Sequence, residues 1–209
     1  MVDEMESNLG MILPERKKGS ETFHFDKKSL GIELLEFWQW SCSDLVSNAI
    51  RGKLAEFIVA KALEIDKNVR NEWDSYDLNY KGIKIEVKTS SYLQSWNQKS
   101  LSKIIFRINP TRAWDYNTSK FAEESKRQSD LYVFCLLNQK EKSDVDPLNL
   151  SQWDFFILIT SILNEKAPEQ KTISLSSLKK MKPYEVKFID LKKVVDKIIN
   201  ENHMIREIP

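Results

Sequence analysis

Apolar and polar positions along the chain predict strands and helices in turn. Uninterrupted apolar runs occupy residues 131–137 (LYVFCLL) and 155–160 (FFILIT), a pattern typical of strands covered on both faces. Residues 103–108 (KIIFRI) form a further predicted strand. Near the end of the chain a helical stripe of aliphatic residues begins at Leu191, and Asp190 is its expected cap. Strands that alternate with helices predict an α/β fold with a mixed sheet.

Two helices are predicted before these strands. Residues 30–40 (LGIELLEFWQW) are apolar at a helix-like density that needs burial on more than one side. Ser41 and Ser43 are then N-cap candidates for a second helix that runs to about Leu63. The pattern therefore predicts two consecutive helices in the first third of the chain.

A β-hairpin is predicted after the second helix. Residues 77–80 and 83–90 read as its two strands, and Lys81-Gly82 as a two-residue turn between them. Because successive side chains of a strand point to opposite faces, Glu86 and Lys88 share one face of the second strand. This face carries charged residues, whereas the other face is apolar.

The hairpin brings two carboxylates together. With a two-residue turn Asp77 lies opposite Glu86, and facing like charges are destabilising unless a positive charge lies between them. Mg²⁺ suits such a place, because it takes oxygen ligands and keeps several waters. A shift of two residues would set Asp77 against Lys84, and a three-residue loop would put Asp77 on the other face. In the plainer alternative, Lys84, Glu86 and Lys88 form only the solvated face of an amphipathic strand.

Glu56 lies on a small and apolar side of the second predicted helix. Its neighbours on a helical wheel are Gly52, Val59, Ala60 and Leu63. A buried carboxylate without a partner costs several kcal/mol, roughly, so we expect a partner for it. A metal-bound water or the Lys88 ammonium would serve, and the alternatives are a structural ion pair or an error in the phase of the wheel.

These residues resemble the pattern of the PD-(D/E)XK nuclease superfamily, which has the restriction-endonuclease-like fold. The pattern places a glutamate in a helix, an aspartate on one strand of a hairpin, and acid-any-lysine on the next. Glu56, Asp77, Glu86 and Lys88 follow this order. Tyr76 stands where the name of the superfamily has proline. The resemblance implies an α/β core in which helices flank a central mixed β-sheet.

The resemblance also implies a metal-dependent DNA endonuclease. In such an enzyme Asp77, Glu86 and the Val87 carbonyl hold Mg²⁺, for which Mn²⁺ can substitute, and Glu56 binds a second ion or a metal-bound water. Lys88 orients the attacking water or offsets charge on the phosphate. Gln94 lines the active site in this comparison. A nuclease fold whose chemistry is idle, and which binds DNA or a protein, is the alternative.

Composition narrows the function classes further. The 209 residues carry a net charge of +1, so a nucleic-acid site has to be a local basic patch. The two cysteines and two histidines are too far apart for a structural zinc site. With no secretory signal and no apolar run long enough for a membrane span, we expect a cytoplasmic protein. The length fits one domain at 23–209, preceded by a flexible N-terminal arm at 1–22.

DNA is the expected partner, and a homodimer is left open. Candidate phosphate contacts and base-stacking residues are Lys84, Lys99, Lys103, Arg107, Arg112, Trp114 and Tyr116. The acid-any-lysine triplet by itself is weak evidence, because Glu185-Val186-Lys187 repeats the same three letters without a nearby hairpin that carries a second acid.

Overall fold

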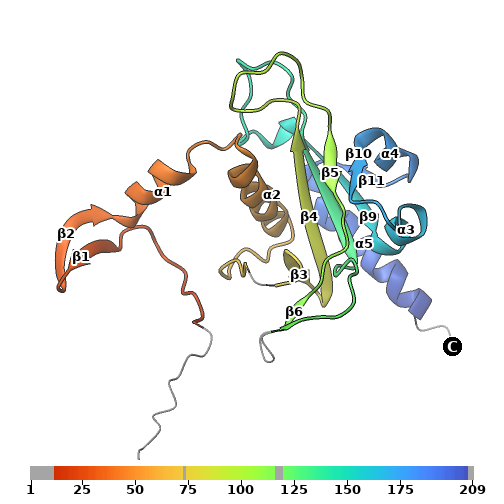
Figure 1. Cartoon of the computed structure of the whole chain (residues 1–209), viewed down its shortest axis with the longest axis horizontal. Helices are drawn as coiled ribbons and strands as arrows, with labels where there is room; N and C mark the ends of the chain where they lie inside the picture. The colour runs from red at the N-terminus through yellow and green to blue at the C-terminus, as the bar shows by residue number, and fades with distance from the viewer. Residues whose placement is uncertain (1–11, 73, 116–119, 207–209) are drawn as a thin grey trace, which may run out of the picture.

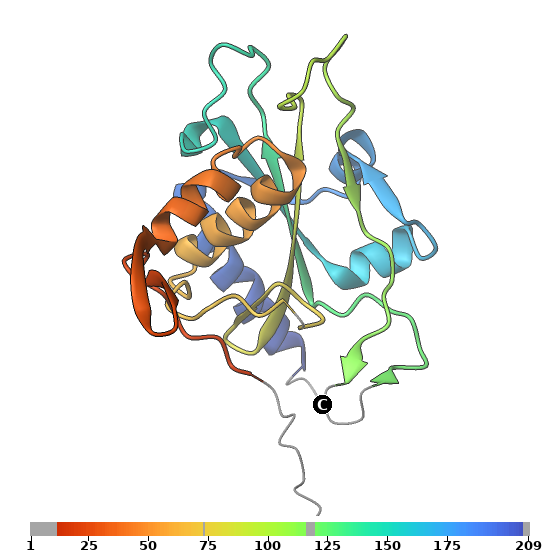
Figure 2. The ribbon, with the colours of Figure 1, turned by 60° about the vertical axis from the view of Figure 1, so that its left-hand side comes forward.

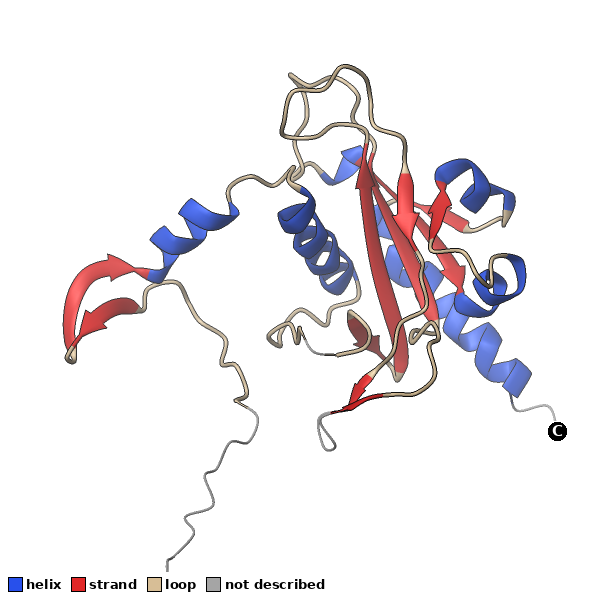
Figure 3. Cartoon of the chain, in the orientation of Figure 1, coloured by secondary structure: helices blue, strands red, loops and turns tan. Residues whose placement is uncertain are grey.

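A central five-stranded sheet organises the computed structural model, which describes residues 12–72, 74–115 and 120–206 (Figures 1 and 3). In spatial order its strands are β11 (Tyr184–Val186), β9 (Trp153–Ile159), β8 (Leu131–Leu137), β4 (Ile83–Ser91) and β3 (Leu78–Tyr80). β4 and β8 run parallel, and the other neighbours are antiparallel. The sheet is therefore mixed, as expected, and its two long apolar runs are strands beside each other near the middle.

Helices and short strands cover both faces of this sheet (Figures 1 and 2). On one face α2 (Asn48–Ala62) and α5 (Phe188–Arg206) pack against the odd-numbered side chains of β4 and β8. On the other face the even-numbered side chains of β8 pack with the elements β5 (Ile105–Arg107), α3 (Thr160–Lys166), β10 (Thr172–Ser174) and α4 (Leu175–Lys180). Burial on both faces explains why β8 contains no polar residue apart from one tyrosine hydroxyl and one thiol.

The hairpin of β3 and β4 has the predicted turn. Lys81 and Gly82 both have positive φ angles, 53° and 81°, as a two-residue turn of type I′ requires. Tyr80 pairs with Ile83 and Leu78 with Ile85. The two-residue register is confirmed, and it sets the positions of the charged residues along β4.

The segment before α2 differs from the prediction. Residues 28–33 form a strand, β2 (Lys28–Glu33), which pairs with β1 (Thr22–Phe25), and the helix α1 (Leu34–Cys42) begins only at Leu34. The expected helix over 30–40 was therefore wrong in its first turn, because Gly31 has a φ of +72° and the apolar Leu30 and Ile32 alternate with Ser29, Gly31 and Glu33.

Both expected helix caps were also wrong. The Ser41 hydroxyl donates to the Phe37 carbonyl at 2.7 Å, and Ser43 donates in the same way to Gln39, so both serines end α1. The N-cap of α2 is Ser47. Asp190 lies inside the first turn of α5, which begins at Phe188, so it favours the helix dipole without being the cap.

Three short elements complete the described chain: β6 (Trp114–Asp115), β7 (Lys120–Phe121) and the 3₁₀ turn η1 (Leu150–Gln152). Within the described residues, none of the helices is long and apolar enough to cross a membrane. The division into a flexible arm at 1–22 and one domain at 23–209 stays a prediction, and residues 1–11 of that arm lie outside the described residues.

Candidate active site

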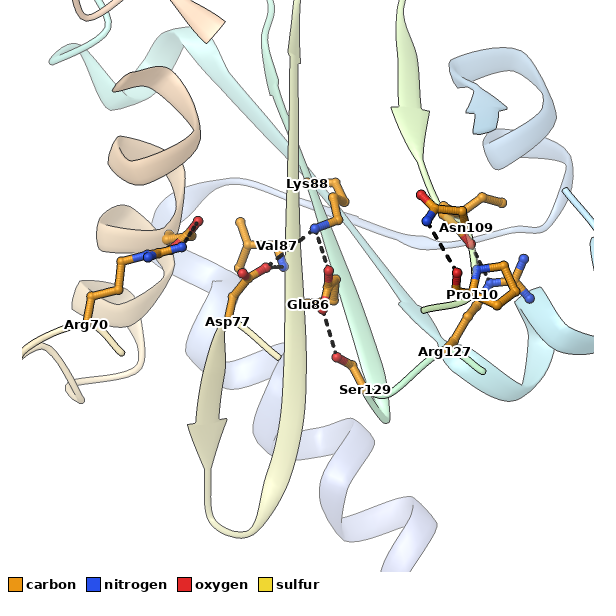
Figure 4. Close-up of polar contacts among 11 residues, drawn as sticks. Arg70, Asp77, Glu86, Val87, Lys88, Asn109, Pro110, Arg127 and Ser129 are labelled. Carbon is orange, nitrogen blue, oxygen red and sulfur yellow. Dashed lines mark hydrogen bonds and ion pairs between the residues drawn. The ribbon is translucent and has the colours of Figure 1, made fainter. Parts of the chain in front are cut away.

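β3 begins at Leu78, so beside Asp77 one edge of β4 is not paired with the backbone of β3. We call this edge the open side of β4. The Asp77 N–H donates to the Ile85 carbonyl at 3.1 Å, and its carboxylate accepts the Val87 N–H at 2.7 Å (Figure 4). In the described ladder β3 pairs with β4 no further than Ile85. The Asp77 side chain thus continues the ladder where the backbone of β3 has stopped.

Lys88 joins the two carboxylates of the hairpin. Its Nζ forms an ion pair with Glu86 Oε1 and lies 3.7 Å from Asp77 Oδ2 (Figure 4). The side chains of Lys88, Glu86 and Asp77 are only 28%, 19% and 17% exposed. The positive charge that facing carboxylates need is therefore present, and these residues do not form a solvated strand face.

Burial and charge shift the ionisation of this cluster. Burial raises the pKa of the Glu86 carboxyl, and the nearby Asp77 charge raises it further against the opposing effect of Lys88. For Lys88 burial acts to lower the pKa, but the charges of Asp77 and Glu86 outweigh it and the pKa is raised. Lys88 accordingly stays an ammonium at neutral pH and keeps its three hydrogen-bond donors.

Glu56 approaches the same edge from α2, on the other face of the sheet. Its carboxylate pairs with Arg70, through Nε and through Nη2 at 3.3 Å, and its side chain is 13% exposed. Burial raises the pKa of Glu56, and the charge of Asp77 adds to this effect, while Arg70 and Lys88 oppose it. Glu56 therefore has an ion-pair partner, one of the alternatives left open, and still feels the charges of the hairpin.

Besides Arg70, the partner of Glu56, two further residues of the site were missed at the level of sequence. The Ser129 hydroxyl donates to Glu86 Oε2 at 3.0 Å, from the turn that leads into β8 (Figure 4). Tyr132 pairs with Glu86 in the parallel ladder. Burial raises the pKa of the Tyr132 hydroxyl, and the Glu86 charge raises it further. No local pattern marks either residue, because both reach Glu86 only through the pairing of β4 with β8.

The oxygen atoms at this edge suit a hard cation. Asp77 and Glu86 supply carboxylate oxygens, and the Val87 carbonyl points to the same open side as the Val87 N–H, because both groups of a strand residue point the same way. Mg²⁺ binds in this manner through one or two carboxylates and keeps several waters. No group of three or more histidine, cysteine or acidic side chains within the described residues is arranged to hold a metal. The donor set fits a cation that is largely hydrated.

An open groove leads to this edge. Its volume is about 990 Å³, and Glu56, Arg70 and Asp77 line it together with Trp38 and Phe57. Charged side chains of both signs also line the groove: Arg16, Lys17, Lys53, Lys67, Glu15, Glu64, Asp66 and Asp74. The groove therefore reaches Glu56 and Asp77 along the side of α2, whereas Glu86 and Lys88 are not among its lining residues.

The remaining expected site residues lie elsewhere or serve the fold. Gln94 is buried, and its side-chain amide donates to the Ser91 carbonyl at 3.1 Å and to Ser102 Oγ at 3.2 Å. Its Oε1 has no hydrogen-bond partner in the described structure. Tyr116 lies outside the described residues. The second Glu-Val-Lys triplet differs, because Glu185 pairs with Lys179 on an exposed surface at the opposite edge of the sheet.

Comparison with known proteins gives one family. Residues 33–177 match the family described as bacteriophage T4 endonuclease IV, and this segment contains Glu56, Asp77, Glu86, Lys88 and Gln94. No match was found among curated proteins or among solved structures. The match covers more than half of the sequence, so the chain belongs to the phage T4 endonuclease IV family, a family of nucleases that act on DNA.

Proposed function

We propose that this member of the phage T4 endonuclease IV family is a metal-dependent DNA endonuclease with a restriction-endonuclease-like core. Asp77, Glu86 and Lys88 form its active site in this proposal, and Glu56 assists them. The observation that carries the proposal is the contact of the Lys88 ammonium with both carboxylates beside the open side of β4. A partly buried lysine between two acids is a costly arrangement, and such clusters concentrate at functional sites.

Asp77, Glu86 and the Val87 carbonyl are the groups that would hold Mg²⁺ or Mn²⁺. When bound, the ion would polarise the phosphate and acidify a water. The hydrogen bond from the Val87 N–H fixes one oxygen of Asp77, so the other oxygen is oriented before any substrate arrives. Ser129 does the same for Glu86. Both carboxylates are therefore positioned by groups that need not move during the reaction.

Besides the metal ion, the site would contain one positive charge from the protein, the Lys88 ammonium. Its ammonium is held at strand spacing from Glu86, where it can donate a hydrogen bond to a water or to a phosphate oxygen. Negative charge builds on the phosphate oxygens as the water attacks phosphorus and the sugar oxygen leaves. A fixed ammonium in a site of low exposure stabilises that charge more than the ground state.

Glu56 has a supporting role in this proposal. Its carboxylate is held by Arg70 at the wall of the groove, within the electrostatic reach of Asp77 and Lys88. There it can orient a water on the groove side of the site. Arg70 in turn offers a guanidinium to a phosphate that enters the groove, since its side chain is 37% exposed.

The test is cleavage of plasmid and of linear DNA by the purified chain with Mg²⁺, with Mn²⁺ or with EDTA. Glu86→Gln is the test variant and Glu185→Gln its matched control, because the control changes the same letter of the same triplet on an exposed surface. Cleavage that needs a divalent ion, is lost in Glu86→Gln and persists in Glu185→Gln supports the proposal. Metal-independent cleavage, or cleavage unchanged in Glu86→Gln, contradicts it.

One observation favours the alternative of an idle nuclease fold that binds DNA. Each carboxylate that is expected to bind metal already contacts a positively charged side chain of the protein. Lys88 contacts Asp77 and Glu86, and Arg70 contacts Glu56. If these pairs were permanent, the chain would bind DNA and leave it intact with every metal. The same incubations, followed by a gel-shift measurement, distinguish the two functions.

A further inference from the structure

The N-terminal hairpin and α1 expose a large apolar surface, which we call the arm face. It consists of the side chains Phe23, Phe25, Leu30 and Ile32 of the hairpin and Phe37 and Trp40 of α1. Each of these is between 45% and 84% exposed, and α1 has no buried residue. Apolar surface gathered on one segment in this way marks an interaction site.

The arm face follows from the alternation of side chains in the hairpin. Phe25 pairs with Lys28 and His24 with Ser29, and directly paired residues share a face. Phe23 and Leu30 therefore lie on the face of Phe25, which Lys28 shares at the tip of the hairpin, whereas the other face is polar. That polar face consists of Thr22, His24, Ser29 and Glu33. Because an isolated two-stranded hairpin is marginally stable in water, packing of another surface against its apolar face would stabilise it.

The described part of the chain does not cover this face. α1 and the hairpin stand away from α2 and the sheet (Figure 1). They are braced from behind by the loop before them, since the Gly19 carbonyl accepts the Leu35 N–H at 2.8 Å and Gly19 lies against Trp38. Arg16 ties this loop to the carbonyls of Asp66 and Lys67. The hairpin is thus held at a defined place with its apolar side outward.

We propose that the arm face is a homodimer interface, covered in solution by the arm face of a second copy of this chain. The six side chains expose about as much surface as three and a half fully exposed large residues. At roughly 200 Å² for each, one copy offers roughly 700 Å², which lies within the range of about 600–1,000 Å² that one partner contributes to a standard interface. The proposal does not depend on the catalytic residues of the preceding section.

Charge along the arm favours a protein occupant over lipid or nucleic acid. The only charged residue of α1 is Glu36, whereas helices that bind membranes or phosphates present lysine and arginine beside their apolar residues. The tip of the hairpin carries Asp26, Lys27 and Lys28, and its base carries Glu33 and Glu36. A two-fold axis across the hairpin sets the net positive tip of one copy beside the acidic base of the other, as an isologous interface requires.

The experiment is a measurement of molar mass in solution, by sedimentation and by light scattering, over a range of concentrations of the full chain. One chain has a mass of 24.5 kDa, and we expect twice this value. In Phe25→Asp/Leu30→Asp, two buried carboxylates at the interface should weaken dimerisation by a factor of a hundred or more, roughly, and give the mass of one chain. His24→Asp/Ser29→Asp adds the same charges to the polar face and should stay dimeric.

Circular dichroism and thermal melting check that the variants keep the folded core. A wild-type mass of one chain at every concentration overturns the proposal, whatever the variants do, and so does a dimer that survives Phe25→Asp/Leu30→Asp. Equal dissociation of both double variants also overturns it, because charge alone would then explain the effect. Sedimentation of the wild-type monomer with anionic vesicles or with DNA would identify a different occupant and overturn it as well.

Discussion

Asp77 accepts the backbone N–H of Val87 through its carboxylate, at 2.7 Å, two residues beyond Ile85, the last residue of β4 that pairs with β3. A side chain therefore replaces a backbone acceptor at the edge of the sheet. Because this bond holds the carboxylate against β4, the Lys88 ammonium can contact both Asp77 and Glu86. The charged cluster is a direct continuation of the hairpin.

Lys88→Met should abolish most of the cleavage. The variant keeps the length of the side chain but removes the ammonium, and loss of one fixed donor to a developing charge costs about a hundredfold to a thousandfold in rate. Lys187→Met is the matched control, because Lys187 is the lysine of the second Glu-Val-Lys triplet and pairs with Asp154 at the opposite edge of the sheet. Rates of plasmid nicking measure both. Equal rates in the two variants would remove Lys88 from the mechanism.

The free energy of unfolding should fall as the pH rises above about 4.5, the ordinary value for a glutamate, because burial raises the pKa of Glu56 and of Glu86 in the folded chain. Between the ordinary and the raised pKa the unfolded chain has released the proton and the folded chain still holds it, so ionisation favours unfolding. Glu86→Gln should flatten this dependence. Urea unfolding at a series of pH values measures it.

The control for that measurement is Glu185→Gln, which removes an exposed carboxylate paired with Lys179 and should keep the slope of the wild type. A free energy of unfolding that rises with pH over the same window would mean that Lys88 and Arg70 outweigh burial at the two glutamates.

Ser129→Ala should slow cleavage by about tenfold and shift the acidic limb of the pH–rate profile to higher pH. The lost hydrogen bond to Glu86 Oε2 is one to a charged group, for which about 1.5 kcal/mol is a typical contribution. Since this bond also lowers the pKa of Glu86, its removal raises that pKa. Ser125→Ala, a change on an exposed part of the same connection, should do neither. A loss of rate without a shift of the limb would argue against action through Glu86.

Asp196→Ala should destabilise the fold by about 1–3 kcal/mol without changing the catalytic pH profile, because Tyr80 loses its acceptor. Asp196 joins α5 to the hairpin turn, since it accepts from Tyr80 at 2.9 Å and from Lys81 at 2.7 Å. Chemical denaturation measures the effect.

Acid should produce a similar loss in the wild type. Lys81, Tyr80 and Lys192 lower the pKa of Asp196 below its ordinary 3.8, so its contribution is present above that value and is lost as the pH falls through the lowered pKa. A variant Asp196→Asn that is as stable as the wild type at neutral pH would show that the hydrogen bond from Tyr80 matters and the charge does not.

Local patterns predicted most of the sheet and failed at the N-terminus. The apolar runs of β8 and β9 and the Lys81-Gly82 turn depend on neighbours in sequence, so they were readable without a structure. Residues 30–40 were read as one helix, because apolar density does not distinguish a helix from a strand with an apolar face. The exposure of that face to solvent is a property of the whole molecule.

The sequence by itself determined the spacing of Glu86 and Lys88, the turn that sets Asp77 across from them, and the presence of an acid on the apolar side of α2. Only the tertiary structure decided which groups meet. Ser129 reaches Glu86 across 43 positions of the chain because β8 returns parallel to β4, and Arg70 rather than Lys88 holds Glu56. Alternation and turn chemistry act between near neighbours, whereas the partner of a buried charge is set by which distant segments pack beside it.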